Sequence, residues 1–299
     1  MSTPTRRLVA LTVGFVMIFM GLVGGSLGRV SAAPADATTA RPVTGIARPC
    51  AVEHPWPADA SLAQIRDQLA RNTGLALVGP GWTEQRNRPL VQIIWQTVDA
   101  LGCTSYLDVI TRSHPGLELN AAPIRGWALG DWGLTRPGAL TLDLAKWQAP
   151  LKSGDEGRLV RLFVHELGHA WSRTPQAQPV YDRFATLHAR IGNFSDYGRG
   201  SVNENFSEVI GYYVARCATG NPYDTRVKNK GQYDPYYELV KQHVFDGHEF
   251  GPAVGQAADC TSTGGSLPAP TVARTPKTVK AVPDAEAPVT RVIKESLDR

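Results

Sequence analysis

Cysteine is scarce in this chain, and the spacing of its few cysteines restricts the chemistry they can support. Only 4 cysteines occur in 299 residues, and no two of them form a C-x-x-C pair. This pattern argues against a cysteine zinc site and against a thioredoxin-type motif. In an exported protein an even number of separated cysteines predicts disulfides. Of the three connectivities that are available, we expect Cys50–Cys103 and Cys217–Cys260, because each pair ties one end of the core to a nearby element.

The sequence also has little net charge once its first 32 residues are left out. The formal net charge is +4, but residues 1–32 contain three arginines and no acidic residue, so the rest of the chain carries +1. This near-neutral balance leaves no basic footprint, and we expect no nucleic-acid partner. No long apolar run follows the first 32 residues, so we also expect no membrane attachment once that segment is removed.

The first 32 residues have the organisation of an export signal. Arg6 and Arg7 precede an apolar run from Leu8 to about Val23, and small residues follow near Ala32. This order is typical of a secretory signal peptide, here cleaved after Ala32, and it predicts a secreted, extracellular protein. An uncleaved signal anchor is the alternative, because the run approaches the roughly 20 residues that span a bilayer.

Two further segments have the composition of unstructured chain. Residues 33–49 are rich in small residues, proline and threonine and are interpreted as a linker. Residues 261–299 have the same character and are predicted to be a disordered tail. A spacer that keeps the protein close to a cell wall is the alternative function for this tail. A single domain is therefore expected between residues 50 and 260.

Hydrophobic periodicity within this region predicts strands first and helices second. Helices are expected for residues 61–72, with Ser61 as the N-cap, and for residues 89–102, closed by Gly102. β-branched, aromatic or alternating residues indicate strands at residues 104–113, 125–131 and 138–147. Further helices are expected at residues 156–173, 180–191, 202–217 and 235–245. This order predicts an α+β domain.

The stretch from His165 to His169 reads H-E-L-G-H and carries the clearest chemical signal. The chain has only 7 histidines, and chance produces this pattern in roughly one chain in a hundred or fewer. On a helix the two imidazoles lie about 40° apart and project toward one point. Apolar residues occupy the opposite arc of the predicted helix, so one side is buried as core. The alternative is a pair of buried histidines that only fill space, each of which would still need hydrogen-bond partners.

A catalytic zinc needs a third protein ligand and an open fourth position. Glu204 and Glu208 share one face of the predicted helix 202–217 with Gly211 and Ala215. The small residues on this face let the helix approach another closely and present a carboxylate across the gap. Glutamates four residues apart are equally typical of a solvated face, and the helix pattern alone leaves both readings open.

Taken together, these motifs resemble the anthrax lethal factor-like zinc metallopeptidases, which include the secreted Pro-Pro endopeptidases. The resemblance rests on H165-E-L-G-H169, on Tyr197-Gly198-Arg199, on Glu204 seven positions after Tyr197, and on Glu208 four positions later. It covers about residues 156–217. The sequence departs from the family after Glu204, where Asn205-Phe206-Ser207 replaces an aromatic pair and an alanine.

The resemblance implies a role for each matched residue. His165, His169 and Glu204 would bind one Zn²⁺ per chain, and Glu166 would be the base that takes a proton from the zinc-bound water. Tyr197 would donate a hydrogen bond to the oxyanion of the tetrahedral intermediate.

The resemblance also implies a fold and an activity. The fold would be a single zincin-like domain, with a small mixed sheet followed by the active-site helix and further helices. Glu208 would hold the second ring N–H of a ligand histidine. The strand at residues 138–147 would be either the edge strand that pairs with an extended peptide or an interior strand. The implied function is a secreted zinc endopeptidase with protein or peptide substrates; the alternative is a secreted or wall-associated binding protein with a structural or vestigial zinc site.

Overall fold

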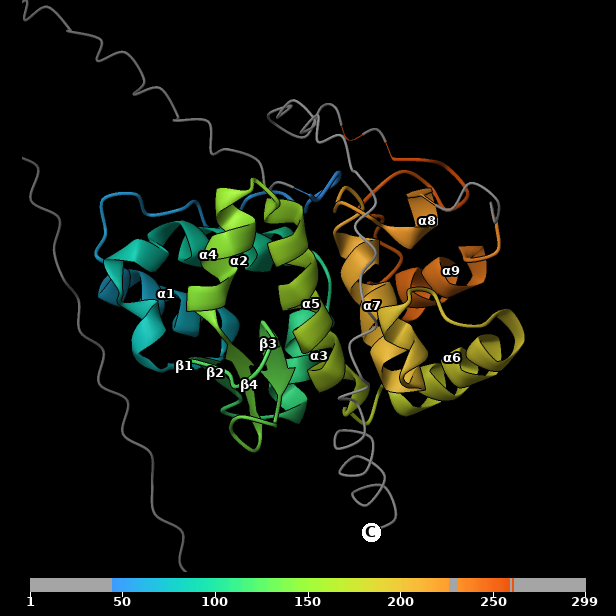
Figure 1. Ribbon diagram of the computed structural model, residues 1–299, viewed down its shortest axis with the longest axis horizontal. Coiled ribbons are helices and arrows are strands. Elements are labelled where there is room, and N and C mark those ends of the chain that lie inside the picture. The colour runs from blue at the N-terminus through green and yellow to red at the C-terminus, as the bar shows by residue number, and fades with distance from the viewer. Residues whose placement is uncertain (1–44, 226–230, 259, 261–299) are drawn as a thin grey trace, which may run out of the picture. The chain divides into compact units, whose positions relative to one another are not determined.

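The computed structural model describes residues 45–225, 231–258 and 260 (Figure 1). The predicted signal peptide, the tail and residues 33–44 of the predicted linker lie outside this described part. Within it, α-helices accompany one small mixed sheet, which confirms the predicted α+β class. Among the described residues, no helix has both the length and the apolar character needed to cross a membrane.

The first two helices begin and end close to the predicted residues. Helix α1 (Leu62–Thr73) starts at a capping box, in which the Ser61 hydroxyl accepts from Gln64 N and the Gln64 side chain accepts from Ser61 N. It ends at Gly74, whose φ of 72° is accessible to glycine at little cost. Helix α2 (Arg88–Ala100) follows two short 3₁₀ turns, η1 (Pro80–Trp82) and η2 (Gln85–Asn87).

Four short strands form the sheet in the order β1-β2-β4-β3. Strands β1 (Ala76–Val78), β2 (Glu118–Ala121) and β4 (Ala139–Leu142) are parallel, and β3 (Gly130–Trp132) runs antiparallel to β4. Strand β4 is therefore interior and β3 forms one edge. Of the two roles left open for the strand predicted at residues 138–147, the interior role is the one the structure shows, because β4 pairs with β2 on one side and with β3 on the other.

Three predicted strands need correction. Residues 104–113 form helix α3 (Tyr106–Ser113), because Tyr106 and Ile110, one helical turn apart, are both fully buried. Of residues 125–131, only the last two lie in β3, since Gly126 turns the chain with a φ of 77°.

The strand predicted at residues 138–147 ends at Leu142. Asp143 then caps helix α4 (Leu144–Lys152) by accepting a hydrogen bond from Lys146 N at 3.1 Å.

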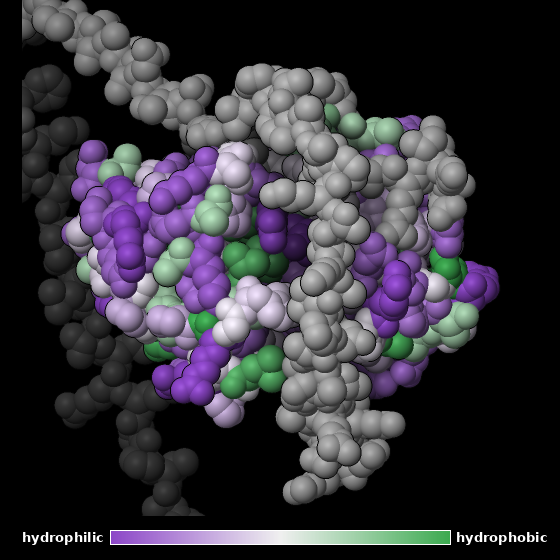
Figure 2. Space-filling view, viewed as in Figure 1, coloured by the Kyte–Doolittle hydropathy of each residue, from purple (hydrophilic) through white to green (hydrophobic). Residues whose placement is uncertain are grey.

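The second half of the domain is helical, as predicted. It contains α5 (Glu156–Ser172), α6 (Gln178–Ile191), the 3₁₀ turn η3 (Tyr197–Arg199), α7 (Val202–Val214), α8 (Pro222–Thr225) and α9 (Asp234–His243). Helix α5 lies between the sheet and α7 (Figure 1), and it also contacts α2, α3 and α4. Its predicted apolar arc is buried, at Leu159, Val160, Phe163, Val164, Leu167, Ala170 and Trp171. On the face shown in Figure 2, hydrophilic and hydrophobic residues are intermixed over the described part of the surface.

Both expected disulfides are present. Cys50 is bonded to Cys103, and Cys217 to Cys260. Residues 45–49 of the predicted linker are instead packed against the domain: Gly45 O accepts from Cys217 N at 3.0 Å, and Arg48 N donates to Phe250 O at 2.8 Å. The packed region thus includes this segment.

Candidate metal centre

Helix α5 brings both histidines of the H-E-L-G-H stretch to one point. His165 and His169 are 3% and 6% exposed, and their Nε2 atoms lie 3.1 Å apart. Their rings meet edge to face, with centroids 4.8 Å apart. The two side chains therefore converge as the four-residue spacing predicts.

Helix α7 adds Glu204 to this point. Its Oε2 atom lies 3.2 Å from His165 Nε2 and 3.3 Å from His169 Nε2, and this buried oxygen has no hydrogen-bond partner. The three atoms thus form a nearly equilateral triangle with sides of 3.1–3.3 Å. At zinc–ligand distances of about 2.0–2.1 Å, tetrahedral ligands lie about 3.3–3.4 Å apart. The residues present fit a zinc ion in both donor type and spacing.

Close packing of α5 against α7 makes this approach possible. A Cβ atom at Gly211 would lie 2.8 Å from the Arg161 carbonyl oxygen and 3.4 Å from His165 Cβ. A Cβ atom at Gly168 would lie 3.2 Å from Ser207 Cα. The small residues on the interface therefore let the backbones come together, as predicted for Gly211, and the glutamates do not form a solvated face.

Glu208 lies on the far side of His165 from the metal point. Its Oε1 atom is 3.1 Å from His165 Nδ1, without the alignment of a hydrogen bond, and it pairs with Arg161. Its Oε2 atom accepts from the Ser195 hydroxyl at 2.7 Å. Burial alone would raise the pKa of Glu208, but His165 and Arg161 lower it to about 2. The carboxylate is thus held charged beside the imidazole.

Opposing effects act on the pKa values of the two groups that meet at the metal point. Burial alone would lower the pKa of His165, but Glu204 and Glu208 raise it to about 10. Burial alone would raise the pKa of Glu204, yet the two histidines hold it well below its usual range. Both shifts record the same mutual attraction between carboxylates and imidazoles.

A different set of groups lies behind His169. Its Nδ1 atom is 3.1 Å from the Ser207 hydroxyl and 3.0 Å from Asn203 Nδ2. Ser207 belongs to the Asn205-Phe206-Ser207 stretch where the sequence departs from the resembled family. Ser207 thus makes a polar contact to a candidate ligand, and α7 is packed closely against α5.

The Glu166 side chain lies against the edge strand β3. A Cβ atom at Gly130 would lie 2.8 Å from both Glu166 Cγ and Glu166 Oε1. Burial, followed by the charges of Glu204 and Asp131, raises the pKa of Glu166, and the two histidines oppose this. Within the described part of the chain no side chain or backbone group hydrogen-bonds to its carboxylate, so a base is available between β3 and the two histidines.

Tyr197 lies over the same region from the turn η3. The residue is 46% exposed, and its ring centroid is 5.8 Å from that of His165. Burial and then the charge of Glu204 raise the pKa of its hydroxyl well above the usual range, so the phenol stays protonated. The Trp127 ring meets it edge to face at 6.2 Å.

Two cavities of about 630 and 700 Å³ flank the site. The first includes His169 and Glu204 in its wall, and the second includes His165. Glu166 and Tyr197 line both. The candidate metal point therefore lies where two parts of one cleft meet.

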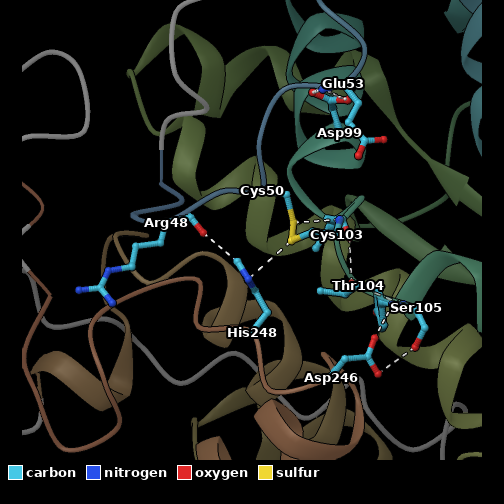
Figure 3. Close-up of a disulfide and its surroundings, with 11 residues drawn as sticks. Arg48, Cys50, Glu53, Asp99, Cys103, Thr104, Ser105, Asp246 and His248 are labelled. Atoms are coloured by element: carbon cyan, nitrogen blue, oxygen red, sulfur yellow. Dashed lines mark hydrogen bonds between the residues drawn. A yellow bond between two sulfur atoms is a disulfide. The ribbon is translucent and has the colours of Figure 1, made fainter.

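A second cluster of potential ligands has a simpler explanation (Figure 3). Cys50, Cys103 and His248 lie close enough to surround a metal ion. Both sulfur atoms belong to a disulfide, so they offer no thiolate. His248 Nε2 donates to Arg48 O at 3.1 Å, and Nδ1 is 3.5 Å from Cys103 Sγ. This histidine joins the C-terminal segment to the disulfide.

No protein-family model, curated protein or solved structure matches the chain. The structure brings the three predicted ligands together and places Glu166 and Tyr197 beside them. Their roles remain predictions. The sequence alone did not indicate Arg161 and Ser195, which contact Glu208. Nor did it indicate Asn203 and Ser207, which contact His169, because no local pattern marks a contact made across helices.

Proposed function

We propose that the chain is a secreted zinc endopeptidase with a zincin-like domain. The observation that carries the proposal is the triangle of His165 Nε2, His169 Nε2 and Glu204 Oε2, whose sides of 3.1–3.3 Å match a tetrahedral zinc site. Three protein ligands beside a cleft leave a fourth position for water or substrate, which is the pattern of catalytic zinc rather than of structural zinc.

The chain's own residues supply the remaining chemistry. When bound, zinc lowers the pKa of a coordinated water toward about 7 and polarises a carbonyl. Glu166 accepts the proton from the attacking water, and its raised pKa makes it a better match for neutral pH than an ordinary carboxylate. Tyr197 keeps its proton and donates a hydrogen bond to the negative charge that develops on the substrate oxygen.

The outer edge of β3, which pairs with no other strand among the described residues, supports a peptide as the substrate. Leu129 O accepts from Asp143 N, and Gly133 N donates to Ala139 O, so the odd-numbered residues of this segment face β4. The backbone groups of Gly130 and Trp132 consequently point toward the cleft, which both residues line. An extended peptide can add to this edge through ladder hydrogen bonds, beside Glu166.

Zinc content and hydrolysis, measured separately, test the proposal. The full chain should bind about one equivalent of zinc, and His165→Ala or His169→Ala should abolish binding. Glu166→Gln should still bind zinc, and its rate of hydrolysis of a peptide library should fall by a factor of roughly 10²–10⁴. Glu238→Gln, an exposed carboxylate on α9, is the matched control and should change neither.

Two results would contradict the proposal. If wild-type protein purified in the presence of zinc contained no stoichiometric zinc, the proposed metal centre would be refuted. Zinc binding with no cleavage of any library peptide would favour the alternative, a binding protein with a structural or vestigial site. The export signal is tested by N-terminal sequencing of the secreted form, which should begin at Ala33.

A further inference from the structure

Arginines that the proposed chemistry does not use line both parts of the cleft. Arg125 and Arg173 line the cavity that contains His169, and Arg158 lines the one that contains His165. All three are exposed. In the part of the chain that the structure describes, none of them has an ion pair or a side-chain hydrogen bond, so their charges are available to a ligand.

The carboxylates of the cleft walls are, by contrast, already engaged. Asp131 accepts from Leu134 N and Thr135 N at 3.0 Å and from the Thr135 hydroxyl. Asp196 pairs with Arg199 at 3.1 Å. The remaining acidic groups that line the cavities, Glu166, Glu204 and Glu208, belong to the candidate metal centre. On either side of that centre, the charge that is free to meet a ligand is positive.

A peptide bound along the edge strand would lie in a defined position relative to these arginines. A peptide paired with Gly130 and Trp132 lies extended along β3, at about 3.3 Å per residue, and passes Glu166 between the two cavities. Side chains upstream and downstream of the scissile bond then reach different arginines. A guanidinium matches a carboxylate in charge and in planar geometry.

We propose that the cleft selects extended peptides with acidic side chains on both sides of the scissile bond. The proposal rests on the peptidase function proposed above and names its substrate class. Arg125 and Arg173 recognise acidic residues in one part of the cleft, and Arg158 recognises them in the other. Because the arginines are exposed, the effect is expected mainly on specificity and association, with strong dependence on salt.

Binding is measured without hydrolysis on the full-length Glu166→Gln chain by fluorescence anisotropy. The probes are two labelled decapeptides with the same neutral centre, one flanked by glutamates and the other by glutamines. The glutamate peptide should bind roughly tenfold more tightly at low salt, the sum of a few exposed ion pairs, and 0.5 M NaCl should remove most of the difference.

Charge reversal identifies the residues. Arg125→Glu with Arg173→Glu, and separately Arg158→Glu, should each remove part of the preference for the glutamate peptide. Arg71→Glu is the matched control, because Arg71 is an exposed arginine on α1 that lines neither cavity, and it should preserve the preference.

The outcomes separate this inference from the proposed function. Equal binding of both peptides, or an equal loss of preference in Arg71→Glu, overturns acidic recognition. So does a labelled single-stranded DNA that binds as tightly as the glutamate peptide, since it would show a general polyanion surface. Cleavage of neutral peptides by the wild type as fast as acidic ones overturns the inference and leaves the peptidase intact. Preferential binding of the glutamate peptide without cleavage by the wild type supports acidic recognition and refutes the peptidase.

Discussion

The two histidines at the metal point differ in what lies behind them. His165 faces the Glu208 carboxylate, which is itself held by Arg161 and Ser195. His169 faces the neutral Ser207 hydroxyl at 3.1 Å. A carboxylate partner increases the basicity of a ligand imidazole, whereas a hydroxyl mainly fixes its orientation. The His165 side of the site is therefore the more strongly polarised one.

Zinc titration should rank the two glutamates of α7. Glu204→Ala removes an atom of the triangle and should abolish stoichiometric binding. Glu208→Ala removes only the group behind His165 and should weaken affinity by roughly 10–100-fold. Circular dichroism must show that both variants fold, since Glu208→Ala also leaves Arg161 unpaired. The reverse ranking would exchange the roles of the two residues.

Tyr197→Phe should separate the hydroxyl from the ring. If the phenol stabilises the developing oxyanion, turnover should fall by roughly 10²–10³, with zinc content unchanged and little change in substrate binding. Tyr181→Phe on α6 is the control, because Tyr181 lines neither cavity of the cleft. Turnover within a factor of about three of the wild type would remove the oxyanion role.

At the level of elements, the long helices could be predicted because their capping residues and their apolar periodicity match the ends and the buried faces that the helices have in the structure. Ser61 and Gly74 bracket α1, and α5 buries the apolar arc that its periodicity shows. Strands β1 and β2 have three and four residues, too few to show a period. The segment of α3 has strand-like composition, and only burial of Tyr106 against the domain, where its hydroxyl donates to Val164 O at 3.2 Å, explains the helix.

The same limit applies to the site. The spacing of His165 and His169 can be read directly from the sequence, and helix geometry places side chains four residues apart on the same face. Glu204 could be identified as a ligand only because its spacing from Tyr197 resembles that of a known family. The sequence of α7 alone does not indicate which helix it packs against. Ser195 and Arg161 act across elements, and the chain carries no local pattern that predicts them.

Gly211→Ala tests the helix contact directly. The new Cβ would lie 2.8 Å from a backbone oxygen of α5, so α7 must move away and carry Glu204 and Glu208 with it. We expect a loss of about 1–3 kcal/mol in the free energy of unfolding and weaker zinc binding. Gly200→Ala is the control, since its nearest neighbour would be 3.9 Å away. Unchanged zinc affinity in Gly211→Ala would show that the packing does not set the ligand positions.

At the scale of the whole molecule, the first residues of the packed region are hydrogen-bonded to segments that are distant in the sequence, including its last residues. Cys50 N donates to Ala100 O at 3.1 Å, Arg48 N donates to Phe250 O, and Gly45 packs against Gly157 at the start of α5. The two disulfides join cysteines that are 53 and 43 positions apart in the sequence, and both lie in this region. Neither loop encloses α5, so the metal ligands on that helix lie outside both.

This arrangement predicts that the disulfides stabilise the fold without shaping the metal point. Replacing either pair by serines should lower the free energy of unfolding by about 2–4 kcal/mol, because each cross-link restricts the unfolded chain. The two losses should not add fully, since Gly45, close to Cys50 in the chain, accepts a hydrogen bond from Cys217 N and thus couples the two regions. Denaturant unfolding of both double variants and of the quadruple variant measures this, and zinc titration of the same proteins should give wild-type affinity. A loss of zinc binding in the folded Cys217→Ser, Cys260→Ser variant would show instead that this disulfide holds α7, whose last turn ends at Val214, in the position from which Glu204 reaches the two histidines.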